Sequence, residues 1–380
     1  MRVLHTADLH LGRQFNGISL EEDHAVVLDQ IIGTIVECEV DVLVIAGDIF
    51  DRAAPPATAV RQFNAFLSRV ASETRAAVAM IAGNHDSGDR IASMSIMTDT
   101  RRALIRGDVS ADERPLVLAD KYGPVAFSGL PFAYEYTARE CFADETLQSP
   151  EDVLAAQVAA ARRNVPEGAR WVIIGHAFVS GAQSSDSERP LVRVGGIETV
   201  GPEIFDGAHY VALGHLHRPQ SVGVPHICYS GSPLAFGFDE AGTAKSMSLV
   251  EIDGAGAVDV KTIPFEPLRG IRTLRGKHAE LVAAEPSTDF IKAVLTDDVP
   301  VIDGMKRLRA VFPNACDLTY ERDQRAPEVK SLDGRQTKMA NPLDVMGDFL
   351  ELVRGERFNE DELKVIATAL HDVRTGEDVE

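Results

Sequence analysis

The sequence has few cysteines and no long apolar run, and both absences narrow the classes of protein it can be. Its 380 residues include four cysteines, Cys38, Cys141, Cys228 and Cys316, and no two of them form a C-x-x-C pair. A four-thiolate zinc site stays geometrically possible, but small buried free thiols are the simpler interpretation. No apolar run reaches the roughly 18 residues that a membrane helix needs, and no signal-peptide pattern opens the chain. We therefore expect a cytoplasmic protein without a membrane segment.

Positive charge is also scarce, which bears on the question of a nucleic-acid substrate. Lys and Arg number 38 against 58 Asp and Glu, so the net charge is −20. Proteins that grip nucleic acid without sequence preference usually do so with Lys and Arg on the phosphates. Composition by itself therefore favours a small phosphorylated substrate. Bound divalent cations would reverse the sign of the charge locally, however, and a separate subunit can supply DNA affinity.

What the first 265 residues do contain is one repeated pattern: a short apolar strand, a small residue and then a polar cluster. Unbroken apolar runs are typical of strands buried on both faces, and helical patterns at 23–36 and 57–72 separate the early ones. The alternation predicts an α/β fold built in layers. Ligands in such folds gather beyond the carboxyl ends of the strands. The expected strands are 2–7, 41–46, 77–82, 171–174 and 210–213.

Side chains that can donate oxygen or imidazole-nitrogen lone pairs follow these strands. Mixed carboxylate and imidazole ligation suits manganese, iron or zinc. The set is larger than one ion needs when positions stay open for water and substrate, so two ions sharing a carboxylate fit better. Two ions about 3.5–4 Å apart can clamp a phosphoryl group from both sides. The candidate ligands are Asp8, His10, Asp48, Asn84, His176, His215 and His217.

Each of these clusters by itself has an ordinary structural explanation. A Gly-Asp step can be a turn, the segment 83–86, GNHD, can be a turn with Asx hydrogen bonds, and a lone histidine is more often structural. Taken jointly and in this order, each at a strand end, the clusters predict a metal site. Glycine tolerates unusual dihedrals and lets the backbone approach a ligand closely. It precedes ligand residues at Gly47, Gly83, Gly175 and Gly214.

Five segments carry a resemblance to a known family. They are 2–12, RVLHTADLHLG; 46–51, AGDIFD; 82–87, AGNHDS; 213–217, LGHLH; and 229–240, YSGSPLAFGFDE. In this order they resemble the calcineurin-like metallophosphoesterase superfamily and, within it, the SbcD family of bacterial nuclease subunits. The last segment discriminates best, because generic phosphoesterases lack it. The resemblance is strong over residues 1–265 and implies two sheets flanked by helices.

The resemblance also implies a pair of manganese ions and a catalytic histidine. Asp48 would bridge the ions, and His85 would lie over the phosphate rather than on a metal. Asp86 would either orient the His85 imidazole or cap a turn. The role of Asp51, where archaeal and eukaryotic relatives have histidine, stays open between DNA positioning and structure. One ion would be held by Asp8, His10, Asp48 and His217, and the other by Asp48, Asn84, His176 and His215.

The function that the resemblance implies is a metal-dependent DNA nuclease. It would act from 3′ to 5′ on duplex ends and as an endonuclease on hairpins and single strands, in double-strand break repair, recombination and replication. An SbcC-type ATPase would be its partner, and the nuclease domain would form a homodimer. The alternatives are a cyclic-nucleotide phosphodiesterase or phosphatase of the same superfamily, which the net charge favours, and a scaffold that uses metal only to fold. A scaffold would be expected to lack ligands, and none is missing.

Three parts are expected along the chain: a nuclease domain at 1–265, a small α/β capping domain at 266–335, and a linker with a C-terminal helix pair at 336–380. In the small domain the pattern predicts strands at 271–275, 289–296 and 316–321, with helices at 278–284 and 303–311. The helix pair is expected at 342–353 and 360–373. Asn359 can cap its second helix, and Glu362 completes a capping-box pattern. The apolar faces of the pair would dock the partner or pack on the small domain.

Overall fold

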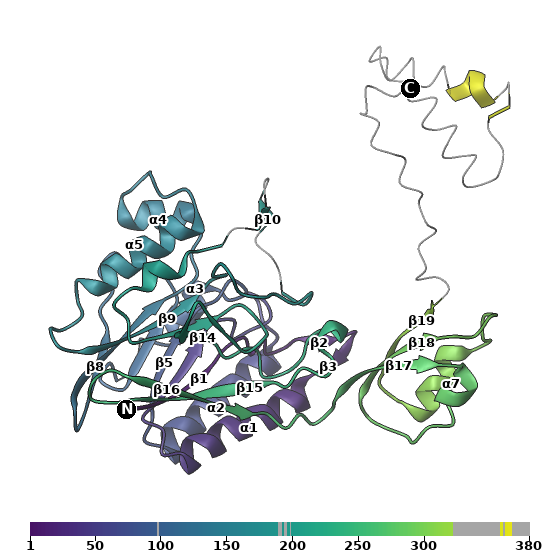
Figure 1. Ribbon diagram of the computed structural model, residues 1–380, viewed down its shortest axis with the longest axis horizontal. Coiled ribbons are helices and arrows are strands. Elements are labelled where there is room, and N and C mark those ends of the chain that lie inside the picture. Colours follow the sequence, from purple (N-terminus) through teal and green to yellow (C-terminus); the bar gives the residue numbers. More distant parts are fainter. Residues whose placement is uncertain are drawn as a thin grey trace. The chain divides into compact units, whose positions relative to one another are not determined.

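The computed structural model describes residues 1–96, 99–188, 192–193, 196–197, 199–321, 358–359 and 362–366 (Figure 1). The described residues up to Glu321 belong to one compact unit, and those from Phe358 onward to a second. Within these ranges, no helix combines the length and the apolar character needed to cross a membrane. Every candidate ligand lies in the first unit.

The centre of the first unit is a pair of six-stranded sheets. In the first sheet, four parallel strands carry an antiparallel pair at one edge. In the second, four parallel strands carry one antiparallel strand at each edge. The first sheet runs β16 (Val258–Pro264), β15 (Ser246–Ile252), β1 (Arg2–Thr6), β4 (Val42–Ala46), β5 (Ala77–Ile81) and β6 (Ala103–Arg106). The second runs β13 (Gln220–Val222), β14 (Val224–Tyr229), β12 (Tyr210–Gly214), β9 (Arg170–His176), β8 (Gly123–Leu130) and β7 (Leu116–Asp120).

Apolar side chains from both sheets share one buried cluster, which explains the unbroken apolar runs. Val44 and Ile81 of the first sheet lie in that cluster with Phe127 and Ile174 of the second. A second cluster joins the first sheet to α1 and α2, and a third joins the second sheet to α5. Figure 1 shows α1 and α2 on one side of the sheets and α4 and α5 on the other. The layers are therefore helix, sheet, sheet and helix, which confirms the predicted layered α/β fold with two sheets flanked by helices.

The two helices expected early in the chain are present as α1 and α2. Helix α5 has no counterpart among the expected elements, although its start carries a capping box: the Asp152 amide donates to Ser149 Oγ at 3.1 Å, and Asp152 accepts from the Ser149 amide at 3.0 Å. Two short antiparallel strand pairs lie in the connections: β2 (Gln14–Phe15) with β3 (Ile18–Ser19), and β10 (Val192–Arg193) with β11 (Gly196–Ile197). The helices are α1 (Glu21–Glu37), α2 (Ala57–Glu73), α3 (Gly88–Ser93), α4 (Glu135–Phe142), α5 (Pro150–Arg162), and the 3₁₀ turns η1 (Pro202–Phe205) and η2 (Phe238–Glu240).

The segment from Ile271 to Tyr320 forms a smaller layer pair with its own apolar cluster, here called the small α/β unit. Its three strands are parallel, and the predicted order of strand, helix, strand, helix and strand is confirmed. The first helix is shorter than the expected 278–284, because the amides of Ala283 and Ala284 bond three residues back, as in a turn, rather than four. The elements are β17 (Ile271–Gly276), α6 (His278–Leu281), β18 (Phe290–Leu295), α7 (Gly304–Val311) and β19 (Ala315–Tyr320).

Most of the expected C-terminal helix pair, 342–353 and 360–373, lies outside the described residues. The described stretch 362–366 is helical. The Glu362 amide donates to the Asn359 side-chain oxygen at 2.9 Å, and the Asn359 amide donates back to the Glu362 carboxylate at 2.9 Å. These reciprocal bonds confirm the predicted capping box.

The four cysteines are free thiols, with Cys228 buried and the other three half-buried. Among the described residues, three groups of side chains are arranged so that they could hold a metal ion, and none includes a cysteine. Free thiols packed as small hydrophobes therefore describe these residues better than a zinc site does.

Candidate metal centre

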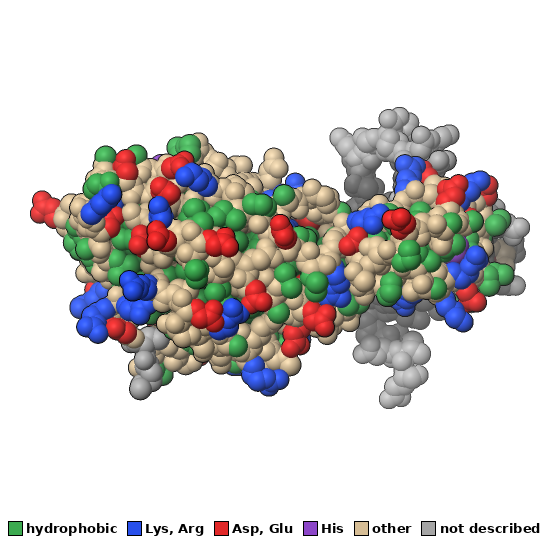
Figure 2. All heavy atoms as spheres, turned by 90° about the horizontal axis from the view of Figure 1, so that it is seen from below, with side chains coloured by type: hydrophobic (Ala, Val, Ile, Leu, Met, Phe, Trp, Pro, Cys, Tyr) green, Lys and Arg blue, Asp and Glu red, His purple; other side chains and the backbone are tan. Residues whose placement is uncertain are grey.

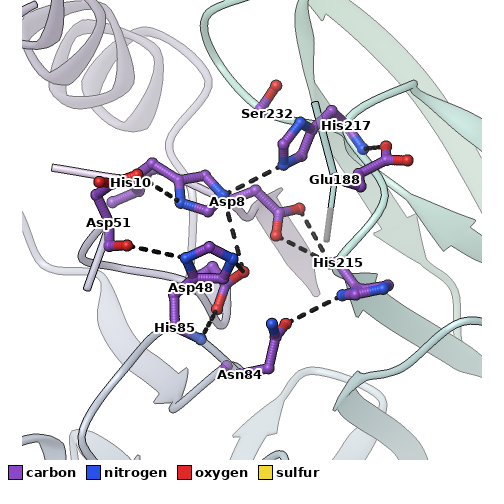
Figure 3. Close-up of polar contacts among 12 residues, drawn as sticks. Asp8, His10, Asp48, Asp51, Asn84, His85, Glu188, His215, His217 and Ser232 are labelled. Atoms are coloured by element: carbon purple, nitrogen blue, oxygen red, sulfur yellow. Dashed lines mark hydrogen bonds and ion pairs between the residues drawn. The ribbon is translucent and has the colours of Figure 1, made fainter. Parts of the chain in front are cut away.

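The carboxyl ends of parallel strands from both sheets meet, and all the candidate ligands lie there. Because neighbouring parallel strands end at the same edge of a sheet, polar residues that follow them are brought together. Figure 3 labels all of them except His176 and shows the labelled side chains gathered around Asp8 and Asp48. Asp8 and His10 follow β1, Asp48 follows β4, and Asn84 and His85 follow β5, while His176 ends β9 and His215 and His217 follow β12.

Backbone strain is concentrated at these strand ends. Asp8, His10 and Asp48 have φ angles of 53°, 46° and 48°, and His215 has a φ of 104°. Residues other than glycine rarely adopt positive φ, and strain of this kind persists only where the surrounding structure enforces it. The chain therefore turns sharply at four of the candidate ligands in order to direct their side chains inward.

Three of the four glycines beside these residues are needed for the close approach that the sequence predicted, and one of them is Gly214, whose Cβ would overlap the Ala46 carbonyl oxygen. A Cβ atom at Gly83 would overlap the carboxylate and amide of Asp48, and one at Gly47, whose φ is +89°, would overlap the His176 imidazole. Gly175 differs, because its Cβ would meet Leu213 at an ordinary 3.4 Å. Only some of the glycines in the motifs are therefore required by the site.

One half of the site, here called the His217 half, contains Asp8, His10 and His217. Their ligand atoms lie within 4.8 Å of one another. The two Nε2 atoms of His10 and His217 are 3.2 Å apart, and the buried Nδ1 of His10 has no hydrogen-bond partner among the described residues. Burial lowers the pKa of His10 and of His217 well below the ordinary value. Both imidazoles are therefore neutral and offer lone pairs, as metal ligation requires.

The other half, here called the His176 half, contains Asn84, His176 and His215. His176 Nδ1 donates to the main-chain oxygen of Ala46 at 2.9 Å, so its Nε2 turns into the site. That Nε2 lies 3.0 Å from Asn84 Oδ1, which is also 3.1 Å from His215 Nδ1. Burial lowers the pKa of His215 to about 3. Oxygen and nitrogen donors thus converge in this half as well.

Asp48 lies between the two halves. Its Oδ2 is 3.5 Å from His176 Nε2, 3.7 Å from His10 Nε2 and 4.0 Å from His85 Nε2. Its Oδ1 accepts a hydrogen bond from the His85 amide at 2.8 Å. Burial would raise the pKa of Asp48, but the charge and the hydrogen bond of His176 outweigh burial and hold this pKa below its usual range. Asp8 is a second carboxylate near histidines of both halves, since it also forms a group with Asp48 and His176 whose ligand atoms lie within 4.8 Å of one another.

The charge balance of the site fits a bound cation. Asp8 is fully buried, and this burial raises its pKa well above the ordinary value, because too little positive charge surrounds its carboxylate. Burial by itself would lower the pKa of His176, but the Asp48 carboxylate outweighs burial and the pKa is raised to about 9. Without a metal, the protonated His176 ring therefore supplies positive charge to the site. A divalent cation would supply that charge instead, and the donor set of carboxylate, amide oxygen and imidazole suits manganese, iron or zinc.

His85 and Asp86 are placed differently from each other. His85 Nδ1 donates to the main-chain oxygen of Asp51 at 2.9 Å, so its Nε2 faces Asp48. The Asp86 carboxylate accepts from the amides of Ile49, Phe50 and Gly83 at 2.9–3.0 Å. These bonds make Asp86 a brace for the two turns that carry the ligands. The expectation that Asp86 orients the His85 imidazole is wrong, because a main-chain carbonyl does so.

Asp51 and Arg13 lie at the edge of the His217 half. Asp51 Oδ1 is 3.4 Å from Arg13 Nη1 and 3.8 Å from His10 Nδ1, and the Arg13 guanidinium lies 4.6 Å from the centre of the Phe236 ring. The Arg13 guanidinium is therefore a positive group beside the proposed metal ligands. Arg13 was not singled out from the sequence, since an arginine three residues after an Asp-x-His has no distinctive spacing.

A further group that the sequence did not reveal surrounds His217. Ser187, Glu188, Glu240 and Lys245 contact its imidazole or its main chain, directly or through one another. Glu240 closes the segment 229–240 that carries the family resemblance, and this was its only signal. The other three have no motif of their own.

Comparisons with known proteins agree with this geometry. The family model of calcineurin-like phosphoesterases matches residues 1–219, more than half of the chain. A second model, SbcD_C, described as the Type 5 capsule protein repressor C-terminal domain, matches residues 264–354. The two matches, in this order, confirm the resemblance to SbcD-type proteins of the calcineurin-like superfamily.

Two solved structures are also similar, though weakly. TT1561 of Thermus thermophilus is 15% identical with a TM-score of 0.39, and the match covers 69% of this chain and 98% of that one. GAP50, the anchor in the inner membrane complex of Plasmodium, is 10% identical with a TM-score of 0.39, covering 84% of this chain and 96% of that one. Neither likeness is strong enough to add to the assignment.

Proposed function

The chain belongs to the calcineurin-like phosphoesterase family, and we propose that it is a two-metal DNA nuclease that works with an ATPase partner. The observation that carries the proposal is the meeting of two ligand groups around Asp48, with His85 beside them. One ion would be held by Asp8, His10, Asp48 and His217, and the other by Asp48, Asn84, His176 and His215. The pair is proposed to be Mn²⁺, one of the metals that this donor set suits.

The chemistry that divalent cations held by these residues would supply is activation of water and neutralisation of charge on the phosphate oxygens. The chain's own contribution to the reaction is His85. Its Nδ1 is held by the Asp51 carbonyl, which leaves Nε2 to meet the substrate. We propose that this nitrogen stabilises or protonates the leaving 3′ oxygen, so that the products carry a 5′ phosphate.

The SbcD_C match favours DNA over a small phosphorylated substrate, since it extends the likeness to SbcD-type proteins beyond the catalytic domain. The proposed activity is 3′ to 5′ exonuclease action on duplex DNA and endonuclease action on hairpins and single strands. The net charge of −20 favours a small substrate instead. Figure 2 shows acidic and basic side chains interspersed over one face of the described residues, rather than a basic stripe. We therefore assign most of the DNA affinity to a partner.

The activity is tested by incubating the purified chain and Mn²⁺ with labelled duplex, hairpin and single-stranded DNA, and in parallel with a cyclic nucleotide and a phosphopeptide. We expect DNA cleavage that stops when the metal is chelated. Cleavage of the cyclic nucleotide or the phosphopeptide, with DNA left intact, would establish the alternative phosphodiesterase or phosphatase instead. Repeating the DNA assay with an SbcC-type ATPase and ATP tests whether the partner controls access to the site.

The partner is proposed to dock on the C-terminal helix pair, within the expected part 336–380. The proposed small capping domain, 266–335, begins close to the start of the SbcD_C match at residue 264. A homodimer through the nuclease domain is proposed as well. Truncation after Ala340 should abolish co-purification with the ATPase and spare Mn²⁺-dependent cutting of single strands. If the truncated chain still assembles with the ATPase, docking lies elsewhere.

A further inference from the structure

We propose that Ser187, Glu240 and Lys245 form a relay that fixes the tautomer and orientation of His217, and so sets the metal affinity of the His217 half alone. The proposal rests on the proposed function only in taking His217 as a metal ligand. These three are positioning residues, because they reach the site through His217 and not by touching a metal or a substrate. They come from three segments: the loop after β9, η2, and the residue before β15.

The direction of each hydrogen bond along the relay determines the His217 tautomer. Ser187 Oγ lies 2.6 Å from Glu240 Oε1 and 2.6 Å from His217 Nδ1. The Glu240 carboxylate, paired with Lys245, accepts from Ser187, so the single hydroxyl proton of Ser187 goes to Glu240. Ser187 Oγ must then accept from His217, which places the imidazole proton on Nδ1. The lone pair of His217 is therefore on Nε2, the atom that faces His10 at 3.2 Å.

Lys245 pairs with Glu240 and holds its carboxylate in place. Its ammonium pairs with the Glu240 carboxylate, and it also donates to Ser232 Oγ at 3.1 Å. The side chain of Glu240 has no exposed surface and that of Lys245 is 7% exposed. A buried carboxylate costs free energy unless it is paired and hydrogen-bonded. The Glu240 carboxylate accepts hydrogen bonds from Lys245, from the Ser187 hydroxyl and from the Phe236 amide, the last at 3.0 Å, so its oxygens are well satisfied.

The main chain of His217 is held by the same neighbourhood. Lys245 Nζ donates to the His217 carbonyl at 2.8 Å, and the His217 amide donates to Glu188 Oε1 at 2.5 Å. Figure 3 shows Glu188 against the main chain of His217. The imidazole can thus turn neither about its side-chain bonds nor with its backbone. Groups that orient metal-binding histidines in this way commonly change metal affinity about 10–100-fold when removed.

The relay also joins the site to the small α/β unit. Glu240 ends η2, which contacts β17, and Phe238 of η2 packs edge-on against Phe15 at 5.1 Å. Phe15 packs in turn on Phe290 of β18 at 4.8 Å. A cavity of about 230 Å³ lies behind the relay, and both Glu240 and Lys245 line it. The small unit therefore supports the segment that carries Glu240, and the His217 half depends on that support.

The test is a Mn²⁺ titration of the full chain without DNA, in which electron paramagnetic resonance measures the concentration of free Mn²⁺. Ser187→Ala should lower one of two affinities by about 10–100-fold and leave the other unchanged. Ser187→Thr keeps the hydroxyl and should restore the weakened affinity. Ser128→Ala is the control, because the Ser128 hydroxyl is also hydrogen-bonded inside the protein, to Trp171 at 3.0 Å, but lies away from the ligands. Both affinities should stay as in the parent.

Nitrogen-15 spectra of histidine-labelled, metal-free protein give a readout that a merely structural role would not move. His217, identified by its loss in His217→Gln, should be protonated on Nδ1 in the parent chain and a mixture of tautomers in Ser187→Ala. Unchanged Mn²⁺ affinities in Ser187→Ala, equal loss of both, or an Nε2-protonated His217 in the parent would overturn the relay. If the titration behaves as expected but the parent chain never cuts DNA, the proposed function fails and the relay stands.

Discussion

The two halves of the metal site hold their histidines in different ways. His176 is the last residue of β9, and a single main-chain oxygen, that of Ala46 in the facing sheet, orients its ring. His217 lies three residues beyond the end of β12, and side chains from three separate segments hold its ring and its backbone. A ligand inside a strand inherits its position from the sheet, whereas a ligand on a loop needs its own side-chain supports.

The difference has consequences for how each half can fail. The His176 half depends on close approach of the two sheets, so added volume between them should damage it. The His217 half depends on polar contacts, so the loss of a single hydroxyl or charge should damage it. Asp48 belongs to both halves. Of the two residues near it, His85 is assigned to the reaction and Asp86 to the support of the turns that carry the ligands.

The largest effect is expected from Asp48→Ala, which should impair metal binding in both halves alike and so remove the difference between them. We expect no Mn²⁺ bound at the parent affinity and no detectable cutting, because the carboxylate lies within 3.7 Å of histidines from each half. A titration and a nuclease assay measure the two effects. Glu113→Gln is the control, since Glu113 is also buried but pairs with Arg106. One ion bound at full affinity with normal cutting in Asp48→Ala would contradict the bridging role.

The next largest effect is expected from His85→Gln, which should leave both halves intact and slow the chemistry. Loss of an acid or charge-stabilising group costs about 10²–10⁴-fold in rate. We expect the two Mn²⁺ affinities and DNA binding to match the parent while single-turnover cleavage falls by that factor. If the variant instead loses a metal ion, His85 is a ligand and the assignment of roles must change.

Gly47→Ala should damage the His176 half selectively, as a counterpart to Ser187→Ala. The new Cβ would overlap the His176 imidazole, and left-handed backbone costs a residue with a side chain roughly 1–2 kcal/mol. We expect at least about a tenfold loss of one Mn²⁺ affinity, and it should be the affinity that Ser187→Ala leaves unchanged. Gly175→Ala is the matched control, because its Cβ would meet only Leu213 at 3.4 Å. Equal weakening of both ions in Gly47→Ala would mean that the halves are not independent.

The smallest effect on chemistry is expected from Asp86→Asn. Asp86 accepts three main-chain amides, and an amide side chain can accept only at its single oxygen, so buried donors lose partners. We expect the free energy of unfolding to fall by about 1–3 kcal/mol, measured by urea titration, with kcat per folded molecule within a few-fold of the parent. A loss of kcat as large as that in His85→Gln would return Asp86 to the catalytic group.

Much of the site could be predicted from the sequence because its signals are local. Polar residues directly after an apolar run indicate the end of a strand, as at Asp8 and His10 and again at His215 and His217. The ends of neighbouring parallel strands lie at one edge of a sheet, so these residues are expected to meet. The capping box at Asn359 and Glu362 is a signal of the same kind, since its residues are three apart. Helix α5 shows the limit, because its buried face is made largely of alanine and valine, a weak periodic signal.

By itself the sequence determined the layered α/β fold, the strand-end positions of the candidate ligands and the order of elements in the small α/β unit, because each depends on residues close together in the chain. Only the tertiary structure decided which groups hold those ligands. Ser187 and Glu240 are separated by 53 residues, and Ser187 and His217 by 30. No periodicity links such residues, since their hydrogen bonds form only once the loops have packed. The same packing made Asp86 a brace for two turns and left the orientation of His85 to the carbonyl of Asp51.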